Sequence, residues 1–344
     1  MRIHIFYNEN SGCDYHRLLL PACYMSLSEN DSIQYFRHSD SLTRDDVFDC
    51  DILFINRMFI VDFKKIEWFK QKYGFKVVVD IDDYNQLPPN HIYYNSWQQN
   101  QIEGRIAQAC ANADYVFVTN EQLYNVYKKL NANIEIIPNA LPFSNTSPLL
   151  EPIESEYTRF LYVAGSSHYN DLKSIKGCLE RLGSDSYFRQ KAKFILCGYE
   201  NPTNDPKNIW HSIESLAKIT KAYVRRGSMA LSDYITHYTH GDVAIAPLEY
   251  NFFNTCKSNL KFIEAARMHK PFICSDTLPY TIDKNKTSGI TYCANSRDWY
   301  KAFKFFIKNK NLTKDLGEEN YQYAKDNYNI ETTNQKRLQI FNSL

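Results

Sequence analysis

Residues 247–276 bring together a cation, small polar side chains and a carboxylate in an order that suits a phosphorylated ligand. Lys257 precedes Ser258 and Asn259 at the start of an expected helix, and a lysine beside the free N–H groups of a helix N-terminus can bind phosphate. Glu264 lies seven residues after Lys257, two helical turns further along the same side. Its carboxylate can accept both hydroxyl hydrogens of a ribose. These residues predict a nucleotide site, and above all a site for a nucleotide-sugar.

The pattern around these residues predicts one βαβ unit of a parallel sheet. An apolar strand at 243–246 leads into a polar and aromatic loop, then into a helix at 258–268, then into a second buried strand. Ligands of such sheets bind at the carboxyl ends of strands, against helix N-termini. A structural interpretation is also open, in which the helix lies on the surface and Glu264 pairs with Lys261 or Arg267.

The run KSNLKFIEAARMHKPFICSD, residues 257–276, resembles the donor-site segment of the GT-B glycosyltransferases, nearest to the retaining family 4 and its bacterial and phage relatives. The resemblance implies that Glu264 holds the donor ribose, while Lys257 and the two residues after it hold the diphosphate. One position departs from the family pattern. Family 4 enzymes usually carry a second glutamate eight residues before the ribose glutamate, close to the transferred sugar, and this chain has Cys256 there.

A turn of small residues, with one glycine, follows the strand expected near residue 160. The run GSSHYNDL resembles a Gly-x-x-His-x-x-Asp-Leu turn found in a subset of bacterial and phage GT-B enzymes. The resemblance implies that Gly165 and Ser166 let backbone N–H groups meet the diphosphate and that His168 lies beside phosphate or sugar. The alternative is that Asp171 caps the following helix and His168 is an exposed turn residue.

The loop after the first strand, 2–7, is the matching feature of the N-terminal half. It has one glycine, Gly12, so it is not a dinucleotide fingerprint. The resemblance implies that this loop faces the cleft between two domains, with Gly12 allowing close backbone approach to the sugar and Tyr15 and Arg17 lining the site. Arg17 is equally compatible with a solvated helix face. His91, in a later loop, could reach the cleft or cap a turn.

An acidic cluster ends a β-branched strand at Asp80, Asp82 and Asp83. Three carboxylates at one strand end repel one another, so something should compensate their charge. A divalent metal is one possibility, and a helix cap is another. We favour an acceptor-side role, in which one carboxylate orients or deprotonates the acceptor hydroxyl and another pairs with Arg17 or with Arg57, which itself follows a strand's carboxyl end.

Composition and element order predict two domains. The 344 residues suffice for two cores, and Lys plus Arg (40) against Asp plus Glu (39) gives a net charge of +1, without global bias toward nucleic acid or membrane. We expect an α/β protein with two Rossmann-like doubly wound domains facing a cleft: an acceptor-side domain at 1–145, a linker at 146–157, a nucleotide-sugar-binding domain at 158–328, and a last helix at 329–344 packing back on the first domain.

The nine cysteines contain no CxxC pair, and several fall inside expected strands or helices. This pattern indicates reduced thiols and a cytoplasmic protein. No signal peptide or membrane-spanning segment is expected.

The function implied by the resemblance is transfer of a hexosyl or pentosyl group from a nucleotide-diphosphate sugar, with a UDP-sugar expected, to an acceptor hydroxyl. Retention of configuration and independence of metal cofactors are expected, and the sequence offers no convincing His–Asp pair to act as a strong base. The acceptor is open between a hydroxylated DNA base, a surface glycan and a protein. Two alternatives remain: an inverting transferase with Asp82 or Asp83 as base, and an inactive GT-B-like binding module, which Cys256 supports.

Overall fold

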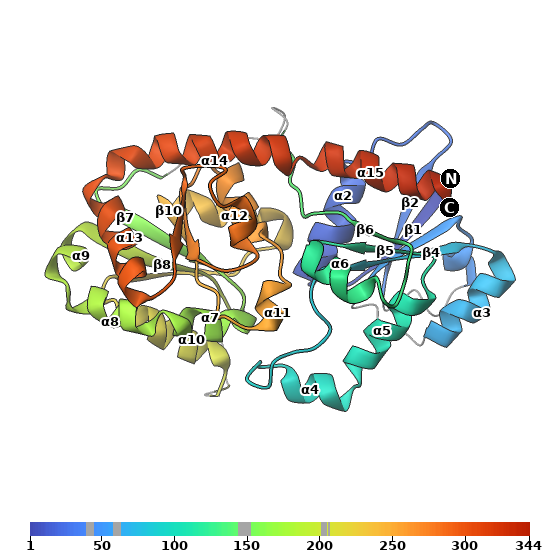
Figure 1. Ribbon diagram of the computed structural model, residues 1–344, viewed down its shortest axis with the longest axis horizontal. Helices are drawn as coiled ribbons and strands as arrows, with labels where there is room; N and C mark the ends of the chain where they lie inside the picture. The colour runs from blue at the N-terminus through green and yellow to red at the C-terminus, as the bar shows by residue number, and fades with distance from the viewer. Residues whose placement is uncertain (39–44, 58–62, 144–152, 201–204, 206) are drawn as a thin grey trace. The chain divides into compact units, whose positions relative to one another are not determined.

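The computed structural model describes residues 1–38, 45–57, 63–143, 153–200, 205 and 207–344 (Figure 1). The chain divides into two compact units. The first comprises Met1–Pro142, Cys256–Ser258 and Tyr328–Leu344, and the second comprises Phe143–Thr255 and Asn259–Asn327. Most of the linker expected at 146–157 lies outside the described residues. In the described part of the chain, no helix is both long enough and apolar enough to cross a membrane.

The first unit is built on a six-stranded parallel sheet in the order β2-β1-β3-β4-β5-β6. Its central strands are continuous apolar runs, because a parallel sheet is covered on both faces. Its strands are β1 (Arg2–Tyr7), β2 (Ser32–Arg37), β3 (Ile52–Asn56), β4 (Lys76–Ile81), β5 (Tyr115–Val118) and β6 (Ile134–Ile136). Its helices are α1 (Gly12–Asp14), a π-helical turn (Tyr15–Leu19), α2 (Leu20–Cys23), a 3-10 turn (Asp45–Phe48), α3 (Phe63–Tyr73), α4 (Tyr94–Gln99), α5 (Ile102–Asn112), α6 (Glu121–Tyr127) and α15 (Ile330–Ser343).

The core of the first unit includes a residue from the last helix. Phe341 of α15 is 2% exposed, and its ring centroid lies 5.4 Å from that of Phe54 and 5.8 Å from that of Phe117. Asn334 of the same helix donates to the carbonyl of Pro21, which places α15 beside α2 (Figure 1). The first sheet is therefore covered in part by a segment made far later in the chain.

The second unit repeats this architecture with a six-stranded parallel sheet in the order β12-β11-β10-β7-β8-β9. Its strands are β7 (Thr158–Val163), β8 (Ala192–Tyr199), β9 (Tyr223–Gly227), β10 (Val243–Ala246), β11 (Phe272–Ser275) and β12 (Ile290–Cys293). Its α-helices are α7 (Tyr169–Ser174), α8 (Lys176–Ser184), α9 (Ser186–Lys191), α10 (Ile209–Lys218), α11 (Phe252–Thr255), α12 (Leu260–Arg267), α13 (Ser296–Lys308) and α14 (Thr313–Asn327). Its 3-10 turns are Ser166–His168, Leu231–His240, Tyr280–Asp283 and Lys310–Leu312.

Helix α12 begins later than the sequence pattern predicts. Asn259 occupies its N-cap, and its first helical residue is Leu260. Lys257 therefore precedes the helix, and the expected spacing of two helical turns between Lys257 and Glu264 does not apply. The two residues also belong to different units, Lys257 to the first and Glu264 to the second.

Candidate active site

Glu264 is a buried carboxylate in the second unit. Its side chain lies on α12 and the residue is 4% exposed. The hydroxyl of Tyr238 donates to its Oε2 at 2.9 Å. Burial raises the pKa of Glu264 above its usual value, against the opposing effects of Lys261 and Tyr238. The interpretation of this segment as a surface helix is therefore wrong, because a buried carboxylate is rare without a specific task or partner.

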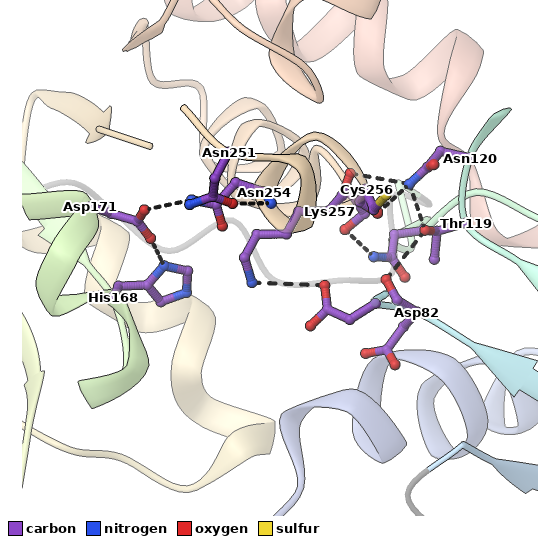
Figure 2. A network of polar contacts seen from close by, with 12 residues as sticks. Asp82, Thr119, Asn120, His168, Asp171, Asn251, Asn254, Cys256 and Lys257 are labelled. Atoms are coloured by element: carbon purple, nitrogen blue, oxygen red, sulfur yellow. Dashed lines mark hydrogen bonds and ion pairs between the residues drawn. The ribbon is translucent and has the colours of Figure 1, made fainter. Parts of the chain in front are cut away.

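His168 and Asp171 form a hydrogen-bonded pair in the turn after β7 (Figure 2). The distance from His168 Nδ1 to Asp171 Oδ2 is 2.7 Å. Oδ1 of Asp171 accepts from the backbone N–H of Glu249 at 2.9 Å and from Asn254 Nδ2 at 3.0 Å. Our expectation that the chain has no convincing His–Asp pair is wrong. Asp171 is also 4% exposed, so it ties the imidazole to the loop after β10 instead of acting as a surface cap.

Space is available at the start of that turn. Gly165 adopts an extended conformation (φ −82°) as the N-cap of the 3-10 turn that begins with Ser166. A Cβ built at Gly165 meets nothing within 4 Å. The proposed contact of this backbone with a diphosphate stays a prediction, and the open volume beside Gly165 is compatible with it.

Arg17 takes one of the two cation pairings that we expected for the acidic cluster. It is 1% exposed and pairs with Asp80, which is 0% exposed, through Nε to Oδ1 at 2.7 Å and Nη2 to Oδ2 at 3.0 Å. It also donates to the carbonyl of Ile137 at 2.8 Å and to Asn139 Oδ1 at 3.0 Å. Arg17 therefore does not lie on a solvated helix face, and its contacts are those of a structural residue in the first unit. Its expected place beside the sugar stays a prediction.

The other two carboxylates of the cluster share two cations. Arg57 donates from Nε to Asp82 Oδ1 at 2.6 Å and from Nη2 to Asp83 Oδ2 at 3.3 Å. Lys257 Nζ lies 3.7 Å from Asp83 Oδ1. Burial opposes the ionisation of Asp82, but the charge of Arg57 and the hydrogen bonds to the carboxylate together outweigh it and lower the pKa of Asp82 to about 2. Burial raises the pKa of Asp83 despite Lys257 and Arg57.

The pairing with Arg57 and Lys257 offsets the repulsion that we expected between the carboxylates of the acidic cluster. Within the described ranges, no group of three or more His, Cys, Asp and Glu side chains has the geometry of a metal site. Asp82 and Asp83 are thus paired with two cations, Arg57 and Lys257.

Two asparagines hold the turn Cys256–Ser258, and neither was among the expected site residues. Asn120 Nδ2 donates to the carbonyls of Cys256 at 2.8 Å and Lys257 at 3.1 Å (Figure 2). Asn139 Nδ2 donates to Ser258 Oγ at 2.7 Å. The sequence signal for both was available: each follows the carboxyl end of a parallel strand, β5 or β6, where ligands and site loops gather.

The acceptor-side roles of Gly12, Tyr15 and His91 stay predictions. Gly12 is the first residue of α1, and Tyr15 is half-buried in the π-helical turn that follows. His91 Nδ1 accepts from the backbone N–H of Tyr93 at 3.2 Å, which agrees with the turn-capping alternative.

Asp14 is a titratable group that the sequence did not reveal. It is 1% exposed, and its Oδ2 accepts from the backbone N–H of Asn8 at 2.7 Å and from Asn8 Nδ2 at 3.1 Å. In the part of the chain that the structure describes, its Oδ1 is buried without a hydrogen-bond partner. Burial, aided by the charge of Asp82, raises the pKa of Asp14 to about 6.

This shift predicts a pH dependence of stability that Asp14→Asn removes. The folded state holds the proton more tightly than the unfolded state, so the stability contributed by the protonated carboxyl is full below about pH 4 and is lost as pH rises through about 6. Between those limits the wild type should lose about 3 kcal/mol relative to the variant. Urea unfolding of both proteins from pH 4 to 7.5 measures the difference. A constant difference across that range would contradict the buried, protonated state.

Comparison with known proteins identifies the fold. No family model matches the sequence, and no curated protein matches it either. Among solved structures, sucrose-phosphate synthase from Thermosynechococcus elongatus aligns with a TM-score of 0.70 and 13% identity, covering 100% of this chain and 98% of that one. HepE from Anabaena, in complex with UDP-glucose, aligns with a TM-score of 0.72 and 11% identity, covering 100% of each chain.

A third solved structure aligns over nearly its whole length. It is an α-glucosyltransferase in complex with UDP and a 13-mer DNA containing an HMU base, with a TM-score of 0.67, 12% identity and 99% of each chain covered. The predicted fold class is confirmed: the chain has the α/β fold of the GT-B glycosyltransferases, with two parallel sheets of six strands.

Proposed function

We propose that this protein is a glycosyltransferase that moves a sugar from a nucleotide-diphosphate sugar, a UDP-sugar, to an acceptor hydroxyl with retention of configuration. The observation that carries the proposal is Glu264, a buried carboxylate on the helix after β10 that accepts from Tyr238, because a carboxylate at this place in the fold is the type of group that binds ribose hydroxyls. Solved structures with this fold bind UDP or UDP-glucose, which supports the choice of donor.

The diphosphate is assigned to cationic and backbone groups. Lys257 supplies a positive charge, and Ser258 a hydroxyl. Asn259 can offer its backbone N–H, whereas its side-chain amide donates to Asp283 Oδ2 at 2.8 Å. In the same assignment the turn at Gly165 and Ser166 offers backbone N–H groups, and His168 lies near phosphate or sugar. Preorganised donors of this kind stabilise the charge that develops on the leaving diphosphate.

Asp82 and Asp83 take the acceptor side in this proposal. Asp82 is a poor general base because its pKa is about 2, so its part is electrostatic, with Arg57 fixing its orientation. The raised pKa of Asp83 favours the second candidate, an inverting transferase in which Asp83 is the base. A hydroxylated DNA base, a surface glycan and a protein side chain are the acceptors to test, the first because one solved structure with this fold is in complex with DNA containing an HMU base.

The test is a product analysis. The purified protein is incubated with a panel of UDP-, GDP-, ADP- and dTDP-sugars, first without acceptor to detect slow hydrolysis and then with each acceptor class. Mass spectrometry identifies the product, and NMR of the new glycosidic bond separates retention from inversion. Binding of nucleotide-sugar with neither hydrolysis nor transfer would favour the inactive binding module, for which Cys256 in place of the usual family 4 glutamate is the argument.

Transfer is expected to survive EDTA. Lys257 and backbone N–H groups can neutralise the leaving diphosphate without a metal ion. The measurement compares initial rates before and after chelation, and after addition of Mg²⁺ or Mn²⁺ to the chelated enzyme. Activity that disappears with EDTA and returns with either ion would make the carboxylates at Asp82 and Asp83 metal ligands and overturn the assignment.

Replacing Asp82 or Asp83 by alanine should lower kcat while leaving the affinity for free UDP nearly unchanged, because neither residue is assigned to the diphosphate. The two variants also separate mechanisms. If Asp83 is a base, Asp83→Ala loses more of kcat than Asp82→Ala; typical losses for a general base are about 10²–10⁴-fold. Nucleotide affinity reduced as much as in a donor-site variant would place the pair on the donor side.

A further inference from the structure

The side chain of Asn139 has a fixed orientation. It is 5% exposed, and its Oδ1 faces Nη1 of Arg17 at 3.0 Å. A guanidinium group has only donors, so the oxygen of the amide must be the atom that faces it. The amide nitrogen then points the other way, toward Ser258 Oγ at 2.7 Å. Arg17 is itself fixed by two hydrogen bonds to Asp80.

This orientation decides how Ser258 can bind. The amide nitrogen of Asn139 has no lone pair to offer, so the hydroxyl oxygen of Ser258 accepts that bond. The hydroxyl hydrogen must therefore point to some other acceptor. Within the described residues, no protein atom accepts it, and Ser258 is half-buried, so the hydrogen is open to a ligand.

We propose that Asn139 is a positioning residue that makes the Ser258 hydroxyl a hydrogen-bond donor to a phosphate oxygen of the nucleotide donor. A chain of hydrogen bonds links the buried Asp80 carboxylate to Ser258 through Arg17 and Asn139. Lys257, the preceding residue, adds a positive charge, and Asn120 fixes its carbonyl. Phosphate oxygens accept and never donate when fully ionised, so a hydroxyl committed to donation suits them. This inference rests on the proposed function and extends it to a residue outside the donor segment.

A double-mutant cycle on Asn139→Asp and Ser258→Ala tests the link. Aspartate has nearly the same shape but only acceptors facing Ser258, so the hydroxyl would turn to donate to it and be withdrawn from the ligand. Isothermal titration with UDP should show about a tenfold loss for Ser258→Ala and at least as large a loss for Asn139→Asp. In the Ser258→Ala background, Asn139→Asp should reduce the affinity for UDP much less than it does in the wild type.

The cycle separates this link from two other effects. If repulsion between the new carboxylate and the phosphates alone weakened UDP binding, Asn139→Asp would reduce the affinity for UDP by the same factor in both backgrounds. The proposal would then fail. A control for general destabilisation is Asn131→Asp: Asn131 is a buried asparagine of the same unit that donates to the carbonyls of Cys110 at 2.9 Å and Ala113 at 2.8 Å. The Asn131→Asp variant should have a lower melting temperature and an unchanged affinity for UDP.

Every outcome bears on one proposal or the other. If Asn139→Asp does not fold, Asn139→Ala takes its place in the cycle with the same expectation of non-additivity. UDP affinity unchanged in Ser258→Ala or in the folded Asn139 variant would overturn the positioning role while the proposed function stands. A wild-type protein that binds none of UDP, GDP, ADP and dTDP would overturn the proposed function, and the positioning role with it.

Discussion

Replacement of Arg17 by methionine is expected to lower the free energy of unfolding by about 3–5 kcal/mol. The substitution keeps most of the volume of the side chain but leaves Asp80, which is 0% exposed, without the guanidinium that donates to both of its oxygens. Breaking a buried ion pair by removing one partner is far more costly than losing an exposed pair, because an uncompensated charge remains in the interior. The measurement is equilibrium unfolding in urea.

A matched control for Arg17→Met is Arg2→Met in the same unit. Arg2 pairs with Asp49 at 2.9 Å, and the two side chains are 47% and 66% exposed. That variant should change stability little, since exposed pairs are screened by solvent. If Arg17→Met also changed stability little, the nearby Arg337, 1% exposed and also on the first unit, would be sufficient to compensate Asp80.

Glu264→Gln is expected to weaken donor binding by about 10- to 100-fold, the loss of one or two charge-assisted hydrogen bonds to the ribose. The amide oxygen of glutamine can still accept from Tyr238, so the fold should persist. Titration with UDP-glucose and UDP measures the change. Glu214→Gln is the control: Glu214 is a carboxylate of the same unit that pairs with Lys218 and Arg225, and its loss should not affect affinity.

Two results would remove Glu264 from the donor site. One is an unchanged dissociation constant for UDP in Glu264→Gln with an unchanged melting temperature. The other is a fall in melting temperature with normal affinity per folded molecule, which would assign the buried carboxylate to the packing of α12 alone.

Periodicity and apolar runs predicted most of the elements. The short apolar runs at 52–56 and 243–246 predict two strands, and β3 and β10 begin and end at these residues. β12 was missed, since ITYC is only half buried and too short for a clear pattern. The apolar pattern of residues 97–112 predicts one helix, but the structure has two, α4 and α5. The break lies at Gln101, whose left-handed backbone (φ 52°) is uncommon for glutamine.

The pairing of site residues was harder to predict than their location. The rule that polar residues gather at strand carboxyl ends found Asp80, Asp82, Asp83 and Arg57, but it could not say which cation meets which carboxylate. That depends on the strand order β1-β3-β4, which the sequence alone does not contain. His168 and Asp171, by contrast, are three residues apart in one turn, and their contact could have been inferred from spacing.

Because α15 contributes to the core of the first unit, that unit can complete its fold only after the end of the chain has been synthesised. N-terminal domains commonly fold while the rest of the chain is still being made. Here Phe341 packs on Phe54 and Phe117, so a ribosome must pass through the whole second unit before the first sheet receives its covering helix. Until then the nascent chain carries an incompletely covered apolar sheet, the state in which chaperones engage and aggregation begins. The unit that opens the chain is the last to be completed.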